Sequence, residues 1–226
     1  MSSETPVEQY PVRADYRFSP AQVEAAFSEQ ELCCWNQAAR FKVVELGAVV
    51  ITSGAVVAGD PLAGSMTALK RRVPPGIYPV SLALVRLSSG DERIAFARML
   101  LTTAPVVTWA TGWHDAVPQP VVENGQRRLV VREYAFYFSD TGAGCFADAA
   151  SVPLIRNRDF DRCLGLMTDG LEDNLKSTWS WFSFKPDPSR QENLVCYQSE
   201  PGSRHSHFGL DAQSNVASIV TDFGML

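Results

Sequence analysis

The densest group of residues that could carry chemistry is the segment Asp140-Thr-Gly-Ala-Gly-Cys-Phe-Ala-Asp148. It combines two carboxylates, two glycines (Gly142 and Gly144) and the Cys145 thiol, directly after a strongly β-forming stretch. A small-residue turn at this strand exit could direct backbone N–H groups and the thiol at a ligand. The same residues also suit a structural turn, in which the glycines supply positive φ and the aspartates cap backbone N–H groups. The sequence leaves both interpretations open.

A nucleophilic Cys145 needs a base or a positive neighbour that holds the thiolate. The chain has three histidines, and nothing in the sequence brings one of them to Cys145. His205 and His207 share one face of a predicted strand, where two imidazoles could approach one ion with Asp115 or Asp211 beside them. No third ligand has the spacing of a metal motif, so we predict neither a metal nor a cofactor.

Composition argues against several classes of protein. The net charge is −5, and Lys and Arg are dispersed apart from Lys70-Arg71-Arg72 and Arg127-Arg128, which disfavours nucleic-acid binding. No run of about 18 apolar residues could span a membrane, and residues 1–10 do not resemble a secretory signal. The five cysteines are odd in number and include the adjacent pair Cys33-Cys34. Reduced thiols in a cytoplasm are therefore expected.

The elements that must position these residues are mostly strands. β-branched and apolar runs broken by Gly, Pro and Asn are typical of strands joined by tight turns. They predict nine strands, over residues 41–52, 55–58, 78–87, 93–101, 106–110, 129–138, 194–197, 205–210 and 216–221. Residues 88–91 and 123–125 supply the turn chemistry of two hairpins. Apolar side chains on both faces of the 129–138 strand predict a sheet that is covered, at least in part, on both sides.

Two helices complete the predicted fold. Ser19 can cap a short helix that starts at Pro20 and ends near Phe27. Apolar residues recur at three- and four-residue spacing over 159–176, which predicts an amphipathic helix packed on a sheet. The fold class is therefore α+β and predominantly β, with antiparallel or mixed sheets in a sandwich-like arrangement, one N-terminal helix and one later packed helix.

The length of 226 residues suits one hydrophobic core. Residues 1–18 have no clear period and predict an N-terminal arm, which is ordered if Tyr10, Tyr16 and Phe18 dock on the body. Residues 19–226 are predicted to form a single globular domain. Within it, the aromatic run over residues 179–184 alternates as a strand would. An exposed face would make it an interaction surface, and burial would make it core.

Five ordered motifs resemble domain-of-unknown-function family 4241. They are Ser53-Gly-x-Val-Val-Ala-x-Asp-Pro61, Val73-Pro-Pro-Gly-x-Tyr-Pro-Val80, Arg93-Ile-Ala-Phe-Ala97, Asp140-x-Gly-x-Gly-Cys-Phe-x-Asp148, and Gly209-x-Asp211 through Val220-Thr-Asp-Phe223. The resemblance covers about residues 43–223. It implies a bacterial protein without an established activity. Because members are discussed near toxin and immunity loci, it also implies a cytoplasmic binding role.

The resemblance singles out polar or special positions along the chain. They are Asp60, Arg93, Asp140, Gly142, Gly144, Cys145, Asp148, Asp211 and Asp222. These side chains would form either a polar cleft or a set of buried caps. Relatives carry a Gly-Asp-Gly-like turn before the last two strands, whereas this chain has Pro201-Gly202-Ser203-Arg204. If the missing acid were catalytic or bound a cation, this chain would be a non-enzymatic member.

Two functions follow as hypotheses. The first is a cytoplasmic binding or interaction protein, immunity-like in a bacterial toxin system, with a partner such as a toxin. The second is a small hydrolase or transferase with a cleft around residues 140–148, whose catalytic candidates are Asp60, Arg93, Asp140, Cys145 and Asp148. Gly142, Gly144 and Asp211 are the candidate ligand-binding residues in that case.

Overall fold

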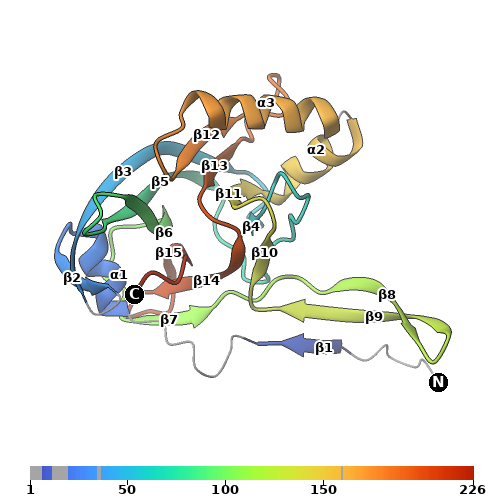
Figure 1. Ribbon diagram of the computed structural model, residues 1–226. Helices are drawn as coiled ribbons and strands as arrows, with labels where there is room; N and C mark the ends of the chain where they lie inside the picture. Colours follow the sequence, from blue (N-terminus) through green and yellow to red (C-terminus); the bar gives the residue numbers. More distant parts are fainter. Residues whose placement is uncertain (1–6, 12–19, 35–36, 159) are drawn as a thin grey trace.

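The structure, a computed structural model, describes residues 7–11, 20–34, 37–158 and 160–226. Strands account for 51% of it and helices for 14%, so the predicted fold class, α+β and predominantly β, is confirmed. The strands form three sheets that are antiparallel or mixed. Figure 1 shows two sheets and the later helices in the body of the molecule, with the third sheet projecting from it.

The largest sheet has eight strands and forms one layer of the body. Its order is β10-β14-β15-β6-β5-β3-β2, and β7 pairs with β14. The strands are β2 (Glu31–Cys34), β3 (Gln37–Ile51), β5 (Gly76–Arg86), β6 (Glu92–Leu100), β7 (Thr108–Thr111), β10 (Tyr137–Ser139), β14 (Gly202–Leu210) and β15 (Val216–Asp222). Gly90, with φ +92°, lies in the predicted β5–β6 turn.

A four-stranded sheet packs on the largest sheet. Its order is β12-β13-β11-β4, with bounds β4 (Val56–Gly59), β11 (Ala143–Asp148), β12 (Ser180–Phe184) and β13 (Leu194–Gln198). Successive side chains point to opposite faces. Phe146 and Tyr197 thus join the main core with the largest sheet, while Cys145 and Cys196 join a second core on the other face. This is the predicted sandwich-like arrangement.

Helices close the outer face of the four-stranded sheet. They are η1 (Ala149–Ser151), α2 (Val152–Arg158) and α3 (Phe160–Asp173), while α1 (Pro20–Phe27) packs elsewhere in the body. Met167 and Leu171 of α3 are buried in the second core. A Cβ at Gly170 would lie 2.4 Å from the Phe182 ring, so α3 approaches β12 closely. The predicted helix over residues 159–176 is confirmed in α3; Ser19 and Asp159 lie outside the described residues.

We call the projecting sheet the arm; it is a different set of residues from the predicted N-terminal arm and shares only β1 with it. The arm consists of β1 (Val7–Tyr10), β8 (Val117–Glu123) and β9 (Gln126–Tyr134) in the order β1-β9-β8. β1 runs parallel to β9, and β8 runs antiparallel to it. Asn124 and Gly125 have φ values of 50° and 76°, as a type I′ hairpin requires. Tyr10 stacks on Tyr134 with 5.0 Å between ring centroids. Tyr16 and Phe18 lie outside the described residues.

Two details of the strand prediction are wrong, and the expected cover on both faces of residues 129–138 holds in part, since Val130 and Glu133 are buried and Leu129 is not. The strand predicted over 129–138 is interrupted, so that β9 belongs to the arm and β10 to the largest sheet. Residues 126–129 are exposed on both faces, because no other described sheet or helix covers the outer half of the arm. The turn expected over residues 140–148 ends at Gly142, and β11 follows it as a buried strand.

Candidate binding pocket and arm face

Asp60 follows β4 and is fully buried. Its Oδ1 accepts hydrogen bonds from the backbone N–H groups of Leu62 and Ala63, both at 3.0 Å. Its Oδ2 accepts bonds from Ser139 Oγ at 3.0 Å and from Thr141 N at 3.2 Å. One carboxylate thereby fixes the turn after β4 and the turn between β10 and β11. Asp60 acts as a cap, which is one of the two roles that the sequence left open.

Asp148 caps the other end of the same strand pair. It is buried and accepts hydrogen bonds from Ser53 N and Ser53 Oγ at 2.7 Å and from Ala150 N at 2.6 Å. It also provides the N-cap of η1. Asp148 lies opposite Val56, whereas Asp60 follows Gly59 at the far end of β4. The two carboxylates therefore occupy opposite ends of the β4–β11 pair and do not converge.

Cys145 lies in the middle of the body, opposite Cys196 of the neighbouring strand. Both thiols are fully buried. Burial raises the pKa of Cys145 well above its ordinary value, and the neighbouring Cys196 and Asp60 raise it further. A nucleophile or metal ligand needs the thiolate, which this environment strongly disfavours. Cys145 packs as a small hydrophobic side chain in the second core.

The two glycines of the segment permit close packing. A Cβ at Gly144 would lie 2.4 Å from the ring of Tyr197, and one at Gly142 would lie 2.2 Å from the carbonyl oxygen of Ser199. Gly142 also has φ +77°, a conformation that side chains disfavour. Neither glycine faces open space, so the structure gives both a packing role.

The remaining candidates are dispersed. Arg93 of β6 forms an ion pair with Glu200, and Asp140 is exposed on the turn before β11. Asp211 closes the β14–β15 hairpin by accepting N–H bonds from Gln213 at 2.9 Å and Asn215 at 2.8 Å. The structure therefore brings Asp60 and Cys145 near each other inside the body but assembles no cleft from the predicted set.

His205 and His207 lie two residues apart on β14 and therefore share one face of the strand, as predicted. His207 is buried. Burial, together with the neighbouring His205, lowers the pKa of His207 to about 3. Among the described residues no group of three or more His, Cys, Asp or Glu side chains could hold a metal ion. Arg204, singled out above because the resemblance implies an acidic turn at this place, is buried in β14. It donates to the Glu200 carbonyl oxygen and lies 4.7 Å from the Phe223 ring centroid.

The aromatic run over residues 179–184 forms part of the core. Trp179 and Phe184 are buried, while Trp181 and Phe182 are partly buried against the two cores. Of the two alternatives for this segment, burial in the core is the one that the structure supports. This segment therefore offers no exposed aromatic face for interaction.

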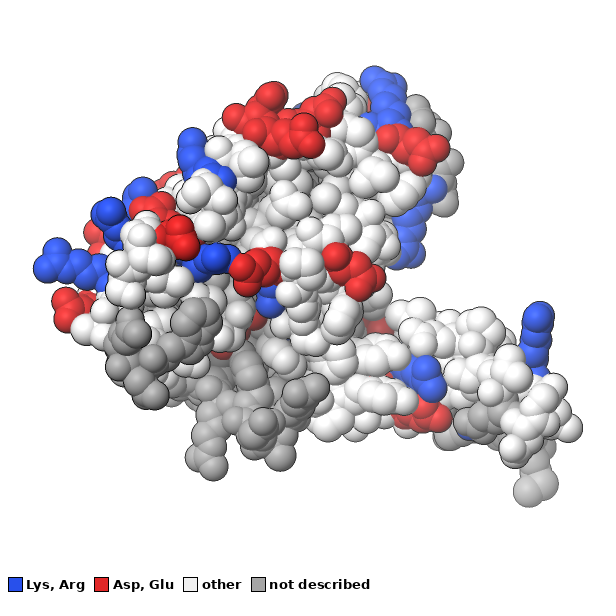
Figure 2. Space-filling view, viewed as in Figure 1, with Lys and Arg blue, Asp and Glu red and all other residues white. Residues whose placement is uncertain are grey.

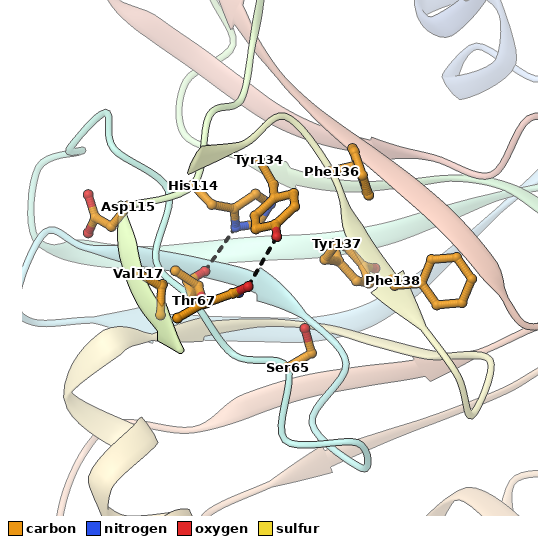
Figure 3. Close-up of a pocket in the computed structure, with 10 residues that line it drawn as sticks. Ser65, Thr67, His114, Asp115, Val117, Tyr134, Phe136, Tyr137 and Phe138 are labelled. Atoms are coloured by element: carbon orange, nitrogen blue, oxygen red, sulfur yellow. Dashed lines mark hydrogen bonds between the residues drawn. The ribbon is translucent and has the colours of Figure 1, made fainter. Parts of the chain in front are cut away.

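A pocket lies where the arm joins the body. It has a volume of about 320 Å³, within the usual range of small-ligand sites. Figure 3 shows Asp115, Val117 and His114 toward one end, with Tyr134 overlapping His114 in this view, and Phe136, Tyr137 and Phe138 toward the other. Its lining residues are Ser65, Thr67, His114, Asp115, Val117, Gln119, Tyr134, Phe136, Tyr137 and Phe138. The pocket thus combines four aromatic side chains with five polar residues and Val117.

His114 is the buried polar side chain of this pocket, at 3% exposure. Its Nδ1 lies 3.1 Å from the carbonyl oxygen of Thr67. Because a carbonyl oxygen only accepts, Nδ1 carries the proton and Nε2 carries the lone pair. Burial lowers the pKa of His114, although the bond to Thr67 opposes the shift. Nε2 is buried and has no hydrogen-bond partner among the described residues.

The face of the arm opposite this pocket is apolar. Directly paired residues of neighbouring strands share a face, and the pairing places Val7, Pro118, Pro120, Val122, Leu129 and Val131 together. We call these six residues the arm face. Val7, Val122 and Leu129 are 50%, 67% and 63% exposed. Figure 2 shows that much of the projecting arm carries neither acidic nor basic side chains on the side it presents.

Sequence reasoning missed the pocket, although part of its signal was present. Tyr134, Phe136 and Phe138 recur at every second residue, which indicates an aromatic stripe along one side of a strand. His114 had no local signal, and its role depends on the segment around Thr67 from elsewhere in the chain. The pocket exists because these distant segments meet.

The architecture is a predominantly β scaffold in which Asp60 and Asp148 act as buried caps. No helix among the described residues is long and apolar enough to cross a membrane. A family model described as "protein of unknown function (DUF4241)" matches residues 49–221. The chain belongs to this family, as its motifs indicated. No curated protein and no solved structure matches it.

Proposed function

We propose that this protein acts by binding a partner protein through the arm face. The observation that carries the proposal is the exposure of Val7, Val122 and Leu129 on one side of a sheet that projects from the body. Grouped apolar side chains on a projecting surface mark interaction sites, whereas single exposed ones are ordinary. Burial of this face against a partner would remove its apolar side chains from water and stabilise the complex.

The arm also indicates how the partner is engaged. β8 is an edge strand, and its Pro118 and Pro120 lack the N–H groups that a further strand would need. Pairing of a partner strand along β8 is therefore disfavoured. Packing of side chains across the arm face remains the favourable mode, because Pro118, Pro120 and Leu129 all present apolar surface there.

Charges at the two ends of the arm face describe the partner further. At the hairpin end, Arg127 is exposed and pairs with Val122, so its guanidinium lies on the same face. At the body end, Glu133 is buried and held by Lys70 at 2.7 Å and Gln9 at 3.0 Å. We infer a partner with an apolar surface and a carboxylate that meets Arg127. A cytoplasmic, immunity-like role with a toxin as the partner agrees with this chemistry.

The geometry favours binding over hydrolase or transferase chemistry. Asp60 and Asp148 have their oxygens engaged by N–H and O–H donors, and Cys145 is a buried neutral thiol. Groups in these states neither reach a substrate nor carry a proton or bond to it. No observation on the described residues favours the second hypothesis.

The test compares Leu129→Glu with a matched control, Ile77→Glu. Ile77 is 70% exposed at the start of β5, outside the arm. The wild type and both variants are mixed with the purified products of the genes adjacent to its own, and complexes are measured by calorimetry and light scattering. We expect a 1:1 complex that Leu129→Glu weakens by about 30-fold or more and that Ile77→Glu leaves unchanged.

Three results would contradict the proposal or its immunity-like form. Equal binding by the wild type and Leu129→Glu would place the partner elsewhere. Self-association of the wild type that Leu129→Glu abolishes would identify the occupant of the arm face as a second copy of this chain. If none of the adjacent products binds, the immunity-like form of the proposal is wrong.

A further inference from the structure

We propose that the pocket beside His114 binds an uncharged, planar heteroaromatic compound that donates an N–H hydrogen bond to His114 Nε2. This site is separate from the arm face. Val117, Gln119 and Tyr134 reach the pocket from the opposite face of the arm, as the pairing of β8 with β9 requires. A small ligand and a protein partner could therefore be bound at the same time.

The walls of the pocket favour a flat ring. Tyr134 and Phe136 lie edge to face, with ring centroids 5.6 Å apart, and Phe138, 54% exposed, lies at the rim (Figure 3). Aromatic rings contribute large apolar area and prefer offset or edge-to-face contacts with other rings. The volume of about 320 Å³ is at the small end of ligand pockets. A compound of one or two fused rings fits these limits.

His114 specifies the polar group of the ligand. Its Nδ1 proton is used by Thr67, which leaves Nε2 as a buried acceptor without a donor among the described residues. An unpaired buried acceptor is unfavourable, so a donor that reaches it contributes more than a solvated bond would. A ligand N–H supplies that donor, whereas a ligand that only accepts hydrogen bonds does not.

Access to Nε2 requires a side-chain movement, because the atom is covered. Tyr134 is suited to move. It is only partly buried, and its hydroxyl is held by Gln119 at 3.4 Å, which is long for an O–H···O bond. Rotation of Tyr134 would break its stack on Tyr10, open a path toward His114 and release Gln119 to contact the ligand edge.

Charge in the pocket argues against an anion. Of the lining residues, only Asp115 carries a charge, and it is paired with Arg72 at 3.0 Å. Burial disfavours the charged imidazolium and lowers the pKa of His114, so with Nδ1–H donated to Thr67 the ring is a neutral acceptor at Nε2. A phosphate or carboxylate would therefore be buried without a cation, which is costly. An uncharged ligand meets no such cost.

The experiment uses pairs of probes that differ only in the donor. Indole and benzimidazole are each compared with their N-methylated forms by ligand-observed NMR titration of the whole wild-type protein at neutral pH. We expect each N–H compound to bind about tenfold more tightly than its N-methyl counterpart, as the loss of one buried hydrogen bond implies. The ¹⁵N resonance of His114 Nε2 should shift only with the N–H compounds.

Two variants complete the test. His114→Phe should remove the difference between N–H and N-methyl probes, while Ile77→Glu, at an exposed position outside the arm, should bind them as the wild type does. The comparison of probes on the wild type stands even if His114→Phe does not fold. Equal affinity for both members of each pair, an unmoved Nε2 resonance, or no binding of any probe at millimolar concentration would each overturn the proposal. None of these outcomes bears on the arm face.

Discussion

Replacement of Asp60 by Asn separates a structural cap from a catalytic carboxylate. Asp60→Asn keeps the shape of the side chain but replaces one acceptor oxygen by an NH₂ group. In one orientation that group meets the N–H donors of Leu62 and Ala63, and in the other it meets the N–H donor of Thr141. Hydroxyl groups can rotate to accept a hydrogen bond, but a backbone N–H cannot. At least one buried donor is therefore left without an acceptor in either orientation.

The size of the effect follows from these contacts. Each unpaired buried donor costs about 1–3 kcal/mol, and hydrogen bonds to a charged acceptor are stronger than neutral ones. Removal of a buried charge offsets part of the loss. We expect Asp60→Asn to lower the free energy of unfolding by about 3 kcal/mol. For a chain of this length, that lowers Tm by roughly 6–12 °C.

The assay is urea unfolding followed by tryptophan fluorescence, with thermal unfolding by circular dichroism. Asp140→Asn is the matched control, because Asp140 is exposed on the neighbouring turn, and it should change stability by less than about 0.5 kcal/mol. A free energy of unfolding for Asp60→Asn within that margin of the wild type, at an unchanged m-value, would refute the assignment of Asp60 as a cap. Asp60 would then again be a candidate for chemistry.

Three further outcomes are expected. Of the five cysteines, all of which the structure describes, only Cys33 is exposed. A thiol reagent should therefore label one site rapidly in the native protein and none in Cys33→Ser. Rapid labelling of Cys145 would contradict its burial. Below pH 6.5 the unfolded chain protonates His207, but the folded protein, with the pKa of that residue near 3, does not. Stability should therefore fall by about 1.6 kcal/mol between pH 6.5 and 5, and urea titrations at each pH should show a flatter profile for His207→Gln. In α3, a Cβ at Gly165 meets nothing within 4 Å, so Gly165→Ala should raise the free energy of unfolding by about 0.5–1 kcal/mol. Gly144→Ala, in contrast, should prevent stable folding. A soluble Gly144→Ala variant with wild-type stability would show that the contact with Tyr197 is not tight.

Local signals predicted most of the elements correctly. Asn124 and Gly125 both have positive φ. A type I′ hairpin turn needs positive φ at these two adjacent positions, so the two residue types alone predict it. The apolar spacing of α3 likewise identified the face, with Met167 and Leu171, that is buried. The nine predicted strands all correspond to observed strands, although the one over 129–138 is interrupted. These features depend on neighbours a few residues apart.

The segment over 140–148 shows where local signals mislead. Gly142 and Gly144 read as turn residues, and Gly142 does lie in a turn with positive φ. Gly144, however, lies in a strand and is needed because the side chain of Tyr197 fills the space where a Cβ would be. The sequence cannot distinguish a glycine required by φ from one required by a close contact. For the same reason it could not decide between a site and a scaffold.

The sequence by itself determined the family, the fold class and the strand and helix periods, because these follow from residue types and short spacings. Only the tertiary structure decided which surfaces are covered. Apolar residues on both faces of the 129–138 segment indicated a sheet covered, at least in part, on both sides, but they could not show that the arm projects and leaves Leu129 exposed. His114 and Thr67 meet through chain folding, not through spacing. Burial depends on which distant elements pack together, and that determines where this protein can bind.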